Sequence, residues 1–459
     1  MVNFISHLKT WTYQNQFIGY DNDDFYQLVE IYCQKLQKTN ATYQKIILAE
    51  RDRYQFLAAF LACLMTQKTI FLANPDWQEW EWKHVIDGVK PDLILGSAQN
   101  YANIDSSKSE EPLSQLSDNT NTSFIMIPTG GSSGKIKFTI HTWETLTASV
   151  NGFKHYFEVQ EINSFCLLPL YHVSGLMQFI RSFVSLGKFV ILPYTSFKEN
   201  PNLPFEYQDF FISLVPKQLQ FFLKKNPEGL AQFKTVLLGG APAWPELLQQ
   251  ARASKIKLAP TYGMTETASQ IVTLKSDDFL AGNNSVGRVL PHAQVMICNA
   301  QGQELGIHQT GIITIQSQSL FLGYYPNFQQ AEVFETDDLG YFDSAGFLHL
   351  VGRNSQKIIT GGENVFPSEV EAVILASNLI TDVVVIGLPD PDWGEIVTAI
   401  YVSKNDNFNL SSLQMILRSQ LSAYKCPKRW IKVQEIPRSP SGKINYQWLK
   451  TYAQSPFKN

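Results

Sequence analysis

Residues 127–137 read Ile127-Pro-Thr-Gly-Gly-Ser-Ser-Gly-Lys-Ile-Lys137, directly after the apolar run Phe124-Ile-Met-Ile127, which is typical of a buried strand. Small residues in a loop after a strand let several backbone amides point at one centre, and such a nest binds phosphate oxygens. A P-loop NTPase motif is excluded, because Thr129 stands where its first glycine belongs and Ile136 replaces its Mg²⁺-binding serine or threonine. A plain surface loop is the alternative for this segment taken alone.

Strand-like and helical segments alternate on both sides of this loop. The helical run Phe56–Met65 lies between the strand-like runs Ile46–Glu50 and Thr69–Ala73, an order that predicts a parallel sheet with a crossover helix. Polar residues dominate 102–123, which we interpret as a surface loop or linker. Further buried strands are predicted at 164–168, 189–192, 211–215 and 235–238.

The pattern changes in the second half of the chain. Short strands with glycine-rich turns between Val286 and Leu350 predict an antiparallel β region. A smaller unit follows, with a helix predicted at 368–376 and strands at 383–386 and 397–401. We therefore expect an α/β protein. It has a large N-terminal domain at 1–353, with α/β sheets plus a β region, and a small mobile α+β C-terminal domain at 354–459.

Composition narrows the class of protein. The 37 Lys and Arg residues against 41 Asp and Glu give a net charge of -4, so we expect no nucleic-acid partner, which would need a basic stripe. Five scattered cysteines without metal-ligand spacing favour a reducing cytosol. The most apolar run, Phe56–Met65, is too short to cross a bilayer, and the first residues carry no secretory signal. The expectation is a soluble, cytoplasmic protein without a membrane partner.

Five further motifs follow the loop in a fixed order. They read Gly-Gly-Ala-Pro-Ala at 239–243, Thr-Tyr-Gly-Met-Thr-Glu-Thr at 261–267, Thr-Asp-Asp-Leu-Gly-Tyr-Phe-Asp at 336–343, Val-Gly-Arg at 351–353 and Pro-Arg-Ser-Pro-Ser-Gly-Lys at 437–443. In this order and at these separations the set resembles the adenylate-forming superfamily of acyl-CoA and aryl-CoA ligases, luciferases and peptide-synthetase adenylation domains. The resemblance spans residues 45 to 445.

The resemblance implies a nucleotide site. Tyr262 offers a flat face to adenine, although a tight turn with a partly buried ring is the alternative. Glu266, with Thr129, is expected to bind the Mg²⁺ of ATP. Asp338 is expected to accept hydrogen bonds from the ribose hydroxyls, unless it and Arg353 form a purely structural ion pair. The expected ATP- and AMP-binding residues are Thr129, Gly130, Gly131, Ser132, Ser133, Gly134, Lys137, Gly239, Gly240, Ala241, Tyr262, Gly263, Thr265, Asp338 and Arg353.

The resemblance also assigns catalysis and movement. Lys443 is the expected catalytic lysine, which offsets the repulsion between a carboxylate and the α-phosphate; a solvated surface lysine is the alternative. Rotation of the small domain between the two half-reactions is expected to bring Gly361 and Gly362 beside the coenzyme A tunnel. The chain departs from the superfamily pattern at three positions. Asp337 replaces a glycine, Ser355 replaces the pivot Asp or Lys, and Ile136 replaces a proline.

The acid and the thiol acceptor are narrowed by two further observations. His172, in Pro169-Leu-Tyr-His-Val-Ser-Gly175, matches a motif near the acyl group, so the expected catalytic set is Lys443, His172 and Glu266. A core histidine is the alternative. No aspartate to pair a substrate amino group is evident, and no carrier-protein domain follows Lys443, which favours coenzyme A.

Within the superfamily the sequence most resembles the o-succinylbenzoate–CoA ligases of menaquinone and phylloquinone biosynthesis. That resemblance implies a small aromatic carboxylic acid as substrate, with His172, Thr267 and Ser269 as candidate contacts, and ATP, Mg²⁺ and coenzyme A as co-substrates and cofactor. Another aryl- or acyl-CoA ligase, or a catalytically idle nucleotide-binding homologue, stays open as an alternative.

Overall fold

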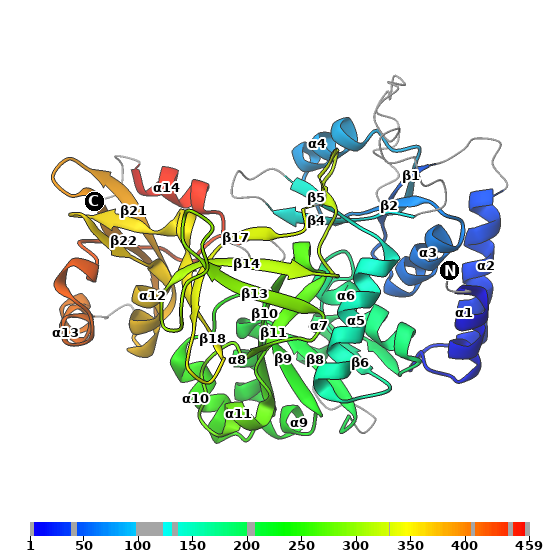
Figure 1. The fold of residues 1–459 in the computed structure, drawn as a ribbon, viewed down its shortest axis with the longest axis horizontal. Coiled ribbons are helices and arrows are strands. Elements are labelled where there is room, and N and C mark those ends of the chain that lie inside the picture. The colour runs from blue at the N-terminus through cyan, green and yellow to red at the C-terminus, as the bar shows by residue number, and fades with distance from the viewer. Residues whose placement is uncertain are drawn as a thin grey trace.

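Four β-sheets carry the described part of the chain (Figure 1). The computed structural model describes residues 4–37, 44–97, 123–130, 136–199, 207–329, 331–404, 409–438 and 444–454. Three sheets belong to a large N-terminal part and the fourth to a smaller C-terminal part, so the predicted mixed α/β fold class is confirmed.

The first sheet has the strand order β16-β15-β5-β4-β2-β1-β3. Its strands are β1 (Lys45–Ala49), β2 (Thr69–Leu72), β3 (Leu93–Gly96), β4 (Ile125–Gly130), β5 (Ile136–His141), β15 (Gly323–Tyr324) and β16 (Asn327–Phe328). Strands β3, β1, β2 and β4 run parallel, which confirms the parallel pair predicted for the runs at 46–50 and 69–73; β3 was not predicted. The crossover helix α3 (Arg53–Met65) is buried along almost its whole length, and Asp52 caps it by accepting a hydrogen bond from the amide of Gln55.

The second sheet has the order β12-β11-β10-β9-β8-β6-β7. Its strands are β6 (Asn163–Cys166), β7 (Phe189–Ile191), β8 (Phe210–Leu214), β9 (Thr235–Leu238), β10 (Leu258–Met264), β11 (Ser269–Thr273) and β12 (Arg288–Val289). The four strands predicted from apolar runs are β6 to β9, and they are parallel. Strand β10 is parallel to β9 but antiparallel to β11.

Helices α3, α5 (Trp143–Phe157) and α6 (Val173–Ser185) lie between these two sheets. One apolar cluster contains residues of all three helices together with Ile46 and Ile127 of the first sheet and Cys166 and Phe189 of the second. The other described helices of this part are α1 (Phe4–Tyr13), α2 (Asn22–Gln37), α4 (Glu79–Val89), α7 (Tyr194–Glu199), α8 (Pro216–Lys225), α9 (Pro227–Ala231), α10 (Pro245–Ala253) and α11 (Ser276–Leu280).

The third sheet confirms the predicted antiparallel β region. It consists of β13 (Ala293–Cys298), β14 (Gly311–Ser317), β17 (Phe334–Phe342) and β18 (Leu348–Arg353). A short 3-10 turn, η4 (Asn354–Gln356), leads from β18 into the C-terminal part.

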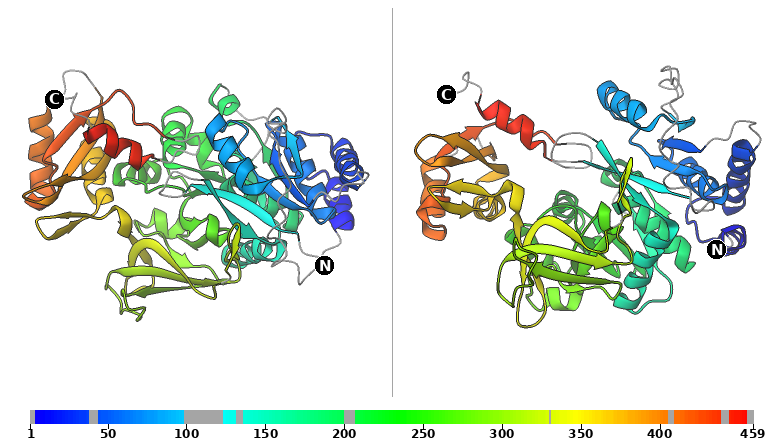
Figure 2. Two further views of the ribbon diagram at one scale, coloured as in Figure 1. Left: turned by 90° about the horizontal axis from the view of Figure 1, so that it is seen from above. Right: turned by 45° about the horizontal axis from the view of Figure 1, so that its top comes forward.

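The C-terminal part has a core of its own. It contains β19 (Ile358–Thr360), β20 (Glu363–Val365), α12 (Pro367–Ala376), β21 (Ile380–Asp390), β22 (Gly394–Ser403), α13 (Leu410–Gln420), η5 (Ala423–Lys425), β23 (Arg429–Lys432) and α14 (Tyr446–Gln454). Two apolar clusters draw only on residues from Ile358 onward. Both views in Figure 2 show this part at one end of the molecule. The domain boundary after residue 353 stays a prediction, and these separate clusters support it.

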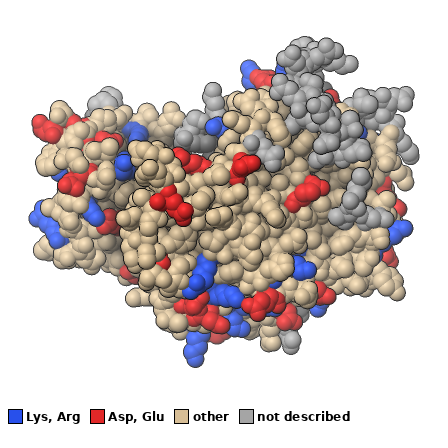
Figure 3. All heavy atoms as spheres, in the orientation of Figure 1, with Lys and Arg blue, Asp and Glu red and all other residues tan. Residues whose placement is uncertain are grey.

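Among the described helices, none combines the length and the apolar character that crossing a bilayer requires. On the face shown in Figure 3, acidic and basic side chains are interspersed, and much of the middle of the face is uncharged.

Candidate active site

The predicted phosphate loop joins two antiparallel strands. Thr129 pairs with Lys137 and Gly130 with Ile136, so β4 and β5 form a hairpin rather than the strand–loop–helix of a P-loop NTPase. Gly131, Ser132, Ser133 and Gly134 lie outside the described residues. The ammonium group of Lys137 lies 5.4 Å from the centre of the Tyr324 ring, which brings β15 to this hairpin.

A tight reversal between β10 and β11 carries the second predicted motif. Gly263 sits so close to β11 that an added Cβ would lie 2.1 Å from the carbonyl oxygen of Ser269. The one-turn helix η3 (Thr265–Thr267) and the left-handed residue Ala268 complete the reversal. This reversal therefore brings three predicted site residues close together along the chain: Tyr262, Glu266 and Ser269.

Glu266 is held from one side by a tyrosine. The Tyr324 hydroxyl donates a hydrogen bond of 2.7 Å to Oε1 of Glu266, and burial, followed by the charge of Glu266, raises the pKa of Tyr324. Nε2 of His141 lies 2.8 Å from the Thr265 carbonyl oxygen, and burial lowers the pKa of His141 to about 4. This histidine is therefore neutral and donates to the turn that carries Glu266. A lone tyrosine or histidine gives no sequence signal for such a role.

The donor set fits a Mg²⁺ ion held mainly by nucleotide phosphates. Mg²⁺ prefers six oxygen ligands and is usually bound by one or two carboxylates with substrate phosphates and water. In the described ranges no three His, Cys, Asp or Glu side chains gather into a metal site. Glu266 is nearly buried, and its bond to Tyr324 fixes one carboxylate oxygen. It is suited to supply the protein's carboxylate.

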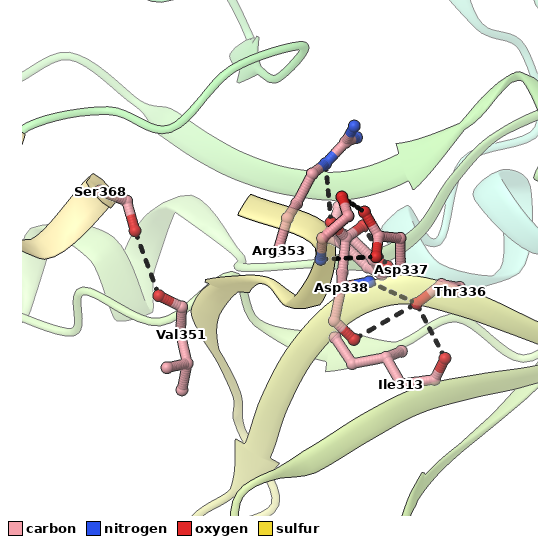
Figure 4. Close-up of polar contacts among 9 residues, drawn as sticks. Ile313, Thr336, Asp337, Asp338, Val351, Arg353 and Ser368 are labelled. Carbon is pink, nitrogen blue, oxygen red and sulfur yellow. Dashed lines mark hydrogen bonds and ion pairs between the residues drawn. The ribbon is translucent and has the colours of Figure 1, made fainter. Parts of the chain in front are cut away.

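Asp338 lies at the centre of the predicted nucleotide cluster (Figure 4). Its Oδ2 accepts a hydrogen bond of 2.9 Å from the Tyr262 hydroxyl, and its Oδ1 accepts one of 3.1 Å from Nε of Arg353. Arg353 on β18 lies directly opposite Asp338 on β17. Its backbone amide donates 3.1 Å to the Thr336 hydroxyl, which donates 2.8 Å to the Ile313 carbonyl. The ion pair considered from the sequence is thus present, and the ribose role stays a prediction. In Figure 4 the outer nitrogens of Arg353 point away from Asp338.

The ring of Tyr262 is only 7% exposed and belongs to an apolar cluster of the β region. Burial, followed by the charge of Asp338, raises its pKa well above the ordinary value, so the phenol stays protonated and donates. The partly buried ring considered as the alternative is therefore what the structure contains. Stacking on adenine stays a prediction for the small exposed part of the ring.

Asp337 faces the other way. Its two carboxylate oxygens accept hydrogen bonds from Ser355, one from the backbone amide at 2.9 Å and one from the hydroxyl. The two adjacent carboxylates are thus separated by function: Asp338 faces Tyr262 and Arg353, while Asp337 holds η4.

Two predicted segments lie at the carboxyl ends of parallel strands in the second sheet, where ligands of α/β sheets bind. Gly239, Gly240 and Ala241 follow β9, and an added Cβ on Gly239 would lie 2.6 Å from Oγ1 of Thr261. His172 follows β6 and is the N-cap residue of α6. Their places agree with a common site, and their individual contacts with ligand stay predictions.

Arg181 is a charged residue that the sequence reasoning missed. It lies on α6 and is 2% exposed. Its Nη2 donates hydrogen bonds of 2.9 Å to Oγ of Ser269 and to Oε1 of Gln270. Its guanidinium carbon lies 4.5 Å from the centre of the Phe153 ring. Burial lowers its pKa to about 9, so it stays charged at neutral pH. Among the described residues no carboxylate pairs with it, and its Nε has no partner. A lone arginine in an apolar helix after the His172 motif was the available signal.

Thr267 and Ser269, both predicted to contact the acid, differ in their surroundings. Thr267 is fully buried, and its hydroxyl donates to the carbonyl oxygens of Met264 at 3.0 Å and Ser269 at 2.6 Å. This hydroxyl already holds the turn together. Ser269 is half-buried and touches Arg181, so it lies beside a buried positive charge.

Lys443 lies outside the described residues. The described residues on either side of 439–443, Arg438 and Ile444, pair with each other as an isolated bridge. Gly361 and Gly362 form the two-residue turn between β19 and β20, both with positive φ (57° and 86°), as such hairpins require. The indole of Trp393 packs on Gly361, and the amide of Gly361 donates 2.9 Å to the Trp393 carbonyl. Within the described ranges, the carboxylates of Asp338 and Glu266 bond to Tyr262, Arg353 and Tyr324 rather than to this turn.

The three-sheet large part, the phosphate-loop hairpin and the Glu266 and Asp338 clusters define an enzyme of the adenylate-forming superfamily. Residues 23–325 match the model of the AMP-binding enzyme family, and residues 369–443 match that of the AMP-binding enzyme C-terminal domain. The chain belongs to the AMP-binding enzyme family.

Known proteins resemble the chain over nearly its whole length. The 2-succinylbenzoate–CoA ligase of Enterococcus faecalis is 31% identical over 95% of this chain and 96% of that protein. The enzyme of the same name from Listeria monocytogenes is 32% identical over 88% of each. Among solved structures, the o-succinylbenzoate CoA synthetase of Bacillus subtilis with its acyl-adenylate intermediate has a TM-score of 0.84 at 23% identity, covering 98% of this chain and 99% of that one. The ATP-bound MatB of Rhodopseudomonas palustris has a TM-score of 0.79 at 21% identity, covering 95% and 94%. These two structures support the fold.

Proposed function

We propose that this protein is an AMP-forming acid–thiol ligase that converts 2-succinylbenzoate to 2-succinylbenzoyl-CoA. In the first half-reaction a substrate carboxylate attacks the α-phosphorus of ATP, which gives an acyl-adenylate and pyrophosphate. In the second the coenzyme A thiolate attacks the acyl carbon, which gives the thioester and AMP. The names of the relatives that are about 31% identical over most of the chain support this activity.

The observation that carries the choice of acid is the buried guanidinium of Arg181. A buried charge without a counter-ion is costly, and an anionic ligand removes much of that cost. The substrate named by the relatives is a benzoate with a succinyl arm, so it has two carboxylates, of which one is activated and one is left over. Arg181 and Ser269 are suited to bind the second carboxylate, whereas a simple fatty acid offers no such group.

The remaining residues take the roles that the superfamily resemblance implies. Asp338 accepts hydrogen bonds from the ribose hydroxyls, Glu266 supplies the protein carboxylate for Mg²⁺, and Lys443 offsets the charge that builds up between the carboxylate and the α-phosphate. Bound Mg²⁺ supplies charge neutralisation on the triphosphate. The Tyr324 hydroxyl, 2.7 Å from Oε1 of Glu266, orients this carboxylate for that role.

The test is pyrophosphate release with ATP, Mg²⁺ and a panel of acids, each with and without coenzyme A. The panel contains 2-succinylbenzoate, 3-benzoylpropionate (the same ring and arm without the ring carboxylate), benzoate and a medium-chain fatty acid. We expect 2-succinylbenzoate to be the best substrate and to give a CoA thioester. A preference for 3-benzoylpropionate or the fatty acid would keep the class of enzyme and reject the acid. Binding of ATP without pyrophosphate release from any acid would instead identify an idle nucleotide-binding protein.

A further inference from the structure

The carboxylate of Asp337 forms hydrogen bonds at the connection between the large and small parts. Turn η4 connects β18, the last strand of the large part, to β19, the first strand of the small part. Asp337 on β17 accepts hydrogen bonds from both the amide and the hydroxyl of Ser355, the middle residue of η4. A rotation about η4 that turns Ser355 away from β17 breaks both bonds.

The bonds between Asp337 and Ser355 are one of several contacts at the junction. An open groove runs along the junction and is lined by Leu350, Val351, Phe366, Ser368, Glu369 and Lys425. Among the described residues, polar contacts across the junction also include the hydrogen bond from the Ser368 hydroxyl to the Val351 carbonyl at 3.1 Å (Figure 4) and the ion pair from Lys217 to Asp382 at 2.8 Å.

Asp337 and Ser355 are also the two departures from the superfamily pattern that the structure brings into contact. The usual residues are glycine at the first position and an acidic or basic residue at the second. Here the charged side chain is on β17 and the hydrogen-bond donor is on the turn. A glycine at 337 has no group to hold η4, so the pair belongs to this chain's own sequence.

We propose that Asp337 is a positioning residue that biases the protein toward the domain orientation seen here, and that release of Ser355 from Asp337 accompanies rotation of the small part to its other orientation. The proposal rests on the proposed two-step function for its kinetic consequence. Both side chains are exposed to water, so the bond biases the equilibrium rather than fixing it. We expect a change of about three- to tenfold in the ratio of the two orientations.

The first experiment measures orientation without any acid. Spin labels are attached at Ile307→Cys on the large part and Met415→Cys on the small part, both well exposed, in a Cys33→Ser, Cys426→Ser background. The distance distribution is recorded for this protein and for Asp337→Asn, Asp337→Gly, Ser355→Ala and Asp337→Asn with Ser355→Ala. We expect each single variant to broaden or shift the distribution, and the double variant to match the larger single effect. Asp343→Asn is the control, because Asp343 caps the backbone of the same β17–β18 hairpin away from the junction.

The second experiment separates the half-reactions in single turnovers. Pyrophosphate release without coenzyme A reports the first, and thioester formation from preformed acyl-adenylate reports the second. We expect Asp337→Asn to change the ratio of the two rates about three- to tenfold, because the step that uses the orientation seen here is slowed while the other is unchanged or faster. Equal loss in both steps, or an unaltered distance distribution, overturns the positioning role. If the parent protein releases no pyrophosphate, the proposed function fails, and the distance distributions still decide the role of Asp337.

Discussion

Replacing Arg181 by methionine tests how the acid is chosen. Methionine keeps much of the volume and the packing on Phe153 but removes the charge. In the proposed complex this leaves a substrate carboxylate buried beside Ser269 without its cation. Breaking a buried ion pair by removing one partner costs about 3–5 kcal/mol. Because Ser269 and Gln270 at 2.9 Å are neutral and remain to donate or accept, we take the lower end of this range. A loss on the order of 100-fold in kcat/KM for 2-succinylbenzoate follows.

The assay compares two acids rather than one. For 3-benzoylpropionate, which lacks the ring carboxylate, the same variant should lose less than about threefold, because no ion pair is broken. Removal of an uncompensated buried charge should also leave the melting temperature unchanged or higher. Arg252→Met is the matched control, since Arg252 lies 4.4 Å from the centre of the Phe279 ring and donates to a backbone carbonyl. Equal losses with both acids, or no loss with either, would refute the reasoning.

Three further predictions concern other parts of the molecule. Asp338→Ala should weaken AMP binding about tenfold or more in calorimetry with little change in the KM for the acid, and unchanged AMP affinity would reject the ribose contact. Gly152→Ala should destabilise the fold by about 1–3 kcal/mol, because its Cβ would lie 1.8 Å from Nδ1 of His292; Gly88→Ala, with open space around it, should raise the melting temperature instead. Burial raises the pKa of the Glu371 carboxyl to about 7, so the folded state binds an extra proton between about pH 4.5 and 7 and loses up to roughly 3 kcal/mol as pH rises through that window. The melting temperature of Glu371→Gln should therefore exceed that of the parent by more at pH 8 than at pH 5. An equal difference at both pH values would contradict the raised pKa of Glu371.

The strands of the fold were accessible from the sequence because each is a short apolar run between polar turns. The run Thr235–Leu238 coincides with β9, and the predicted helix at 56–65 is the buried body of α3. Boundaries shifted by a residue or a few where caps decide them, as at Asp52. The predicted loop after residue 127 lies between the antiparallel strands β4 and β5. Strand β5 was not predicted, because apolar and polar residues alternate at Ile136–His141 instead of forming an apolar run.

The sequence could single out candidate site residues where a motif contains them, and it could not where a contact joins distant segments. Asp338 and Arg353 were identified by motif, and they face each other in the β17–β18 register. The hydrogen bond from Arg181 to Ser269 joins α6 to the start of β11, and neither segment has a sequence pattern that predicts this contact. The same holds for Asp337 and Ser355, which were recognised from the sequence as two separate departures before the hairpin brought them together.

The last strands to join the first sheet also have a consequence for synthesis on the ribosome. Strand β5 has an open edge until β15 arrives, when Tyr324 pairs with Thr139 and the backbone amides of Leu322 and Tyr325 donate to Ile140 and Phe138. An open edge invites pairing with other chains. A nascent chain that ends before Gly323 therefore has an unprotected strand and a Glu266 without its phenol donor. The same short segment covers the open edge of β5 and supplies the hydrogen bond to Glu266, the predicted Mg²⁺ ligand, so we expect a chain released before Gly323 to be prone to aggregation.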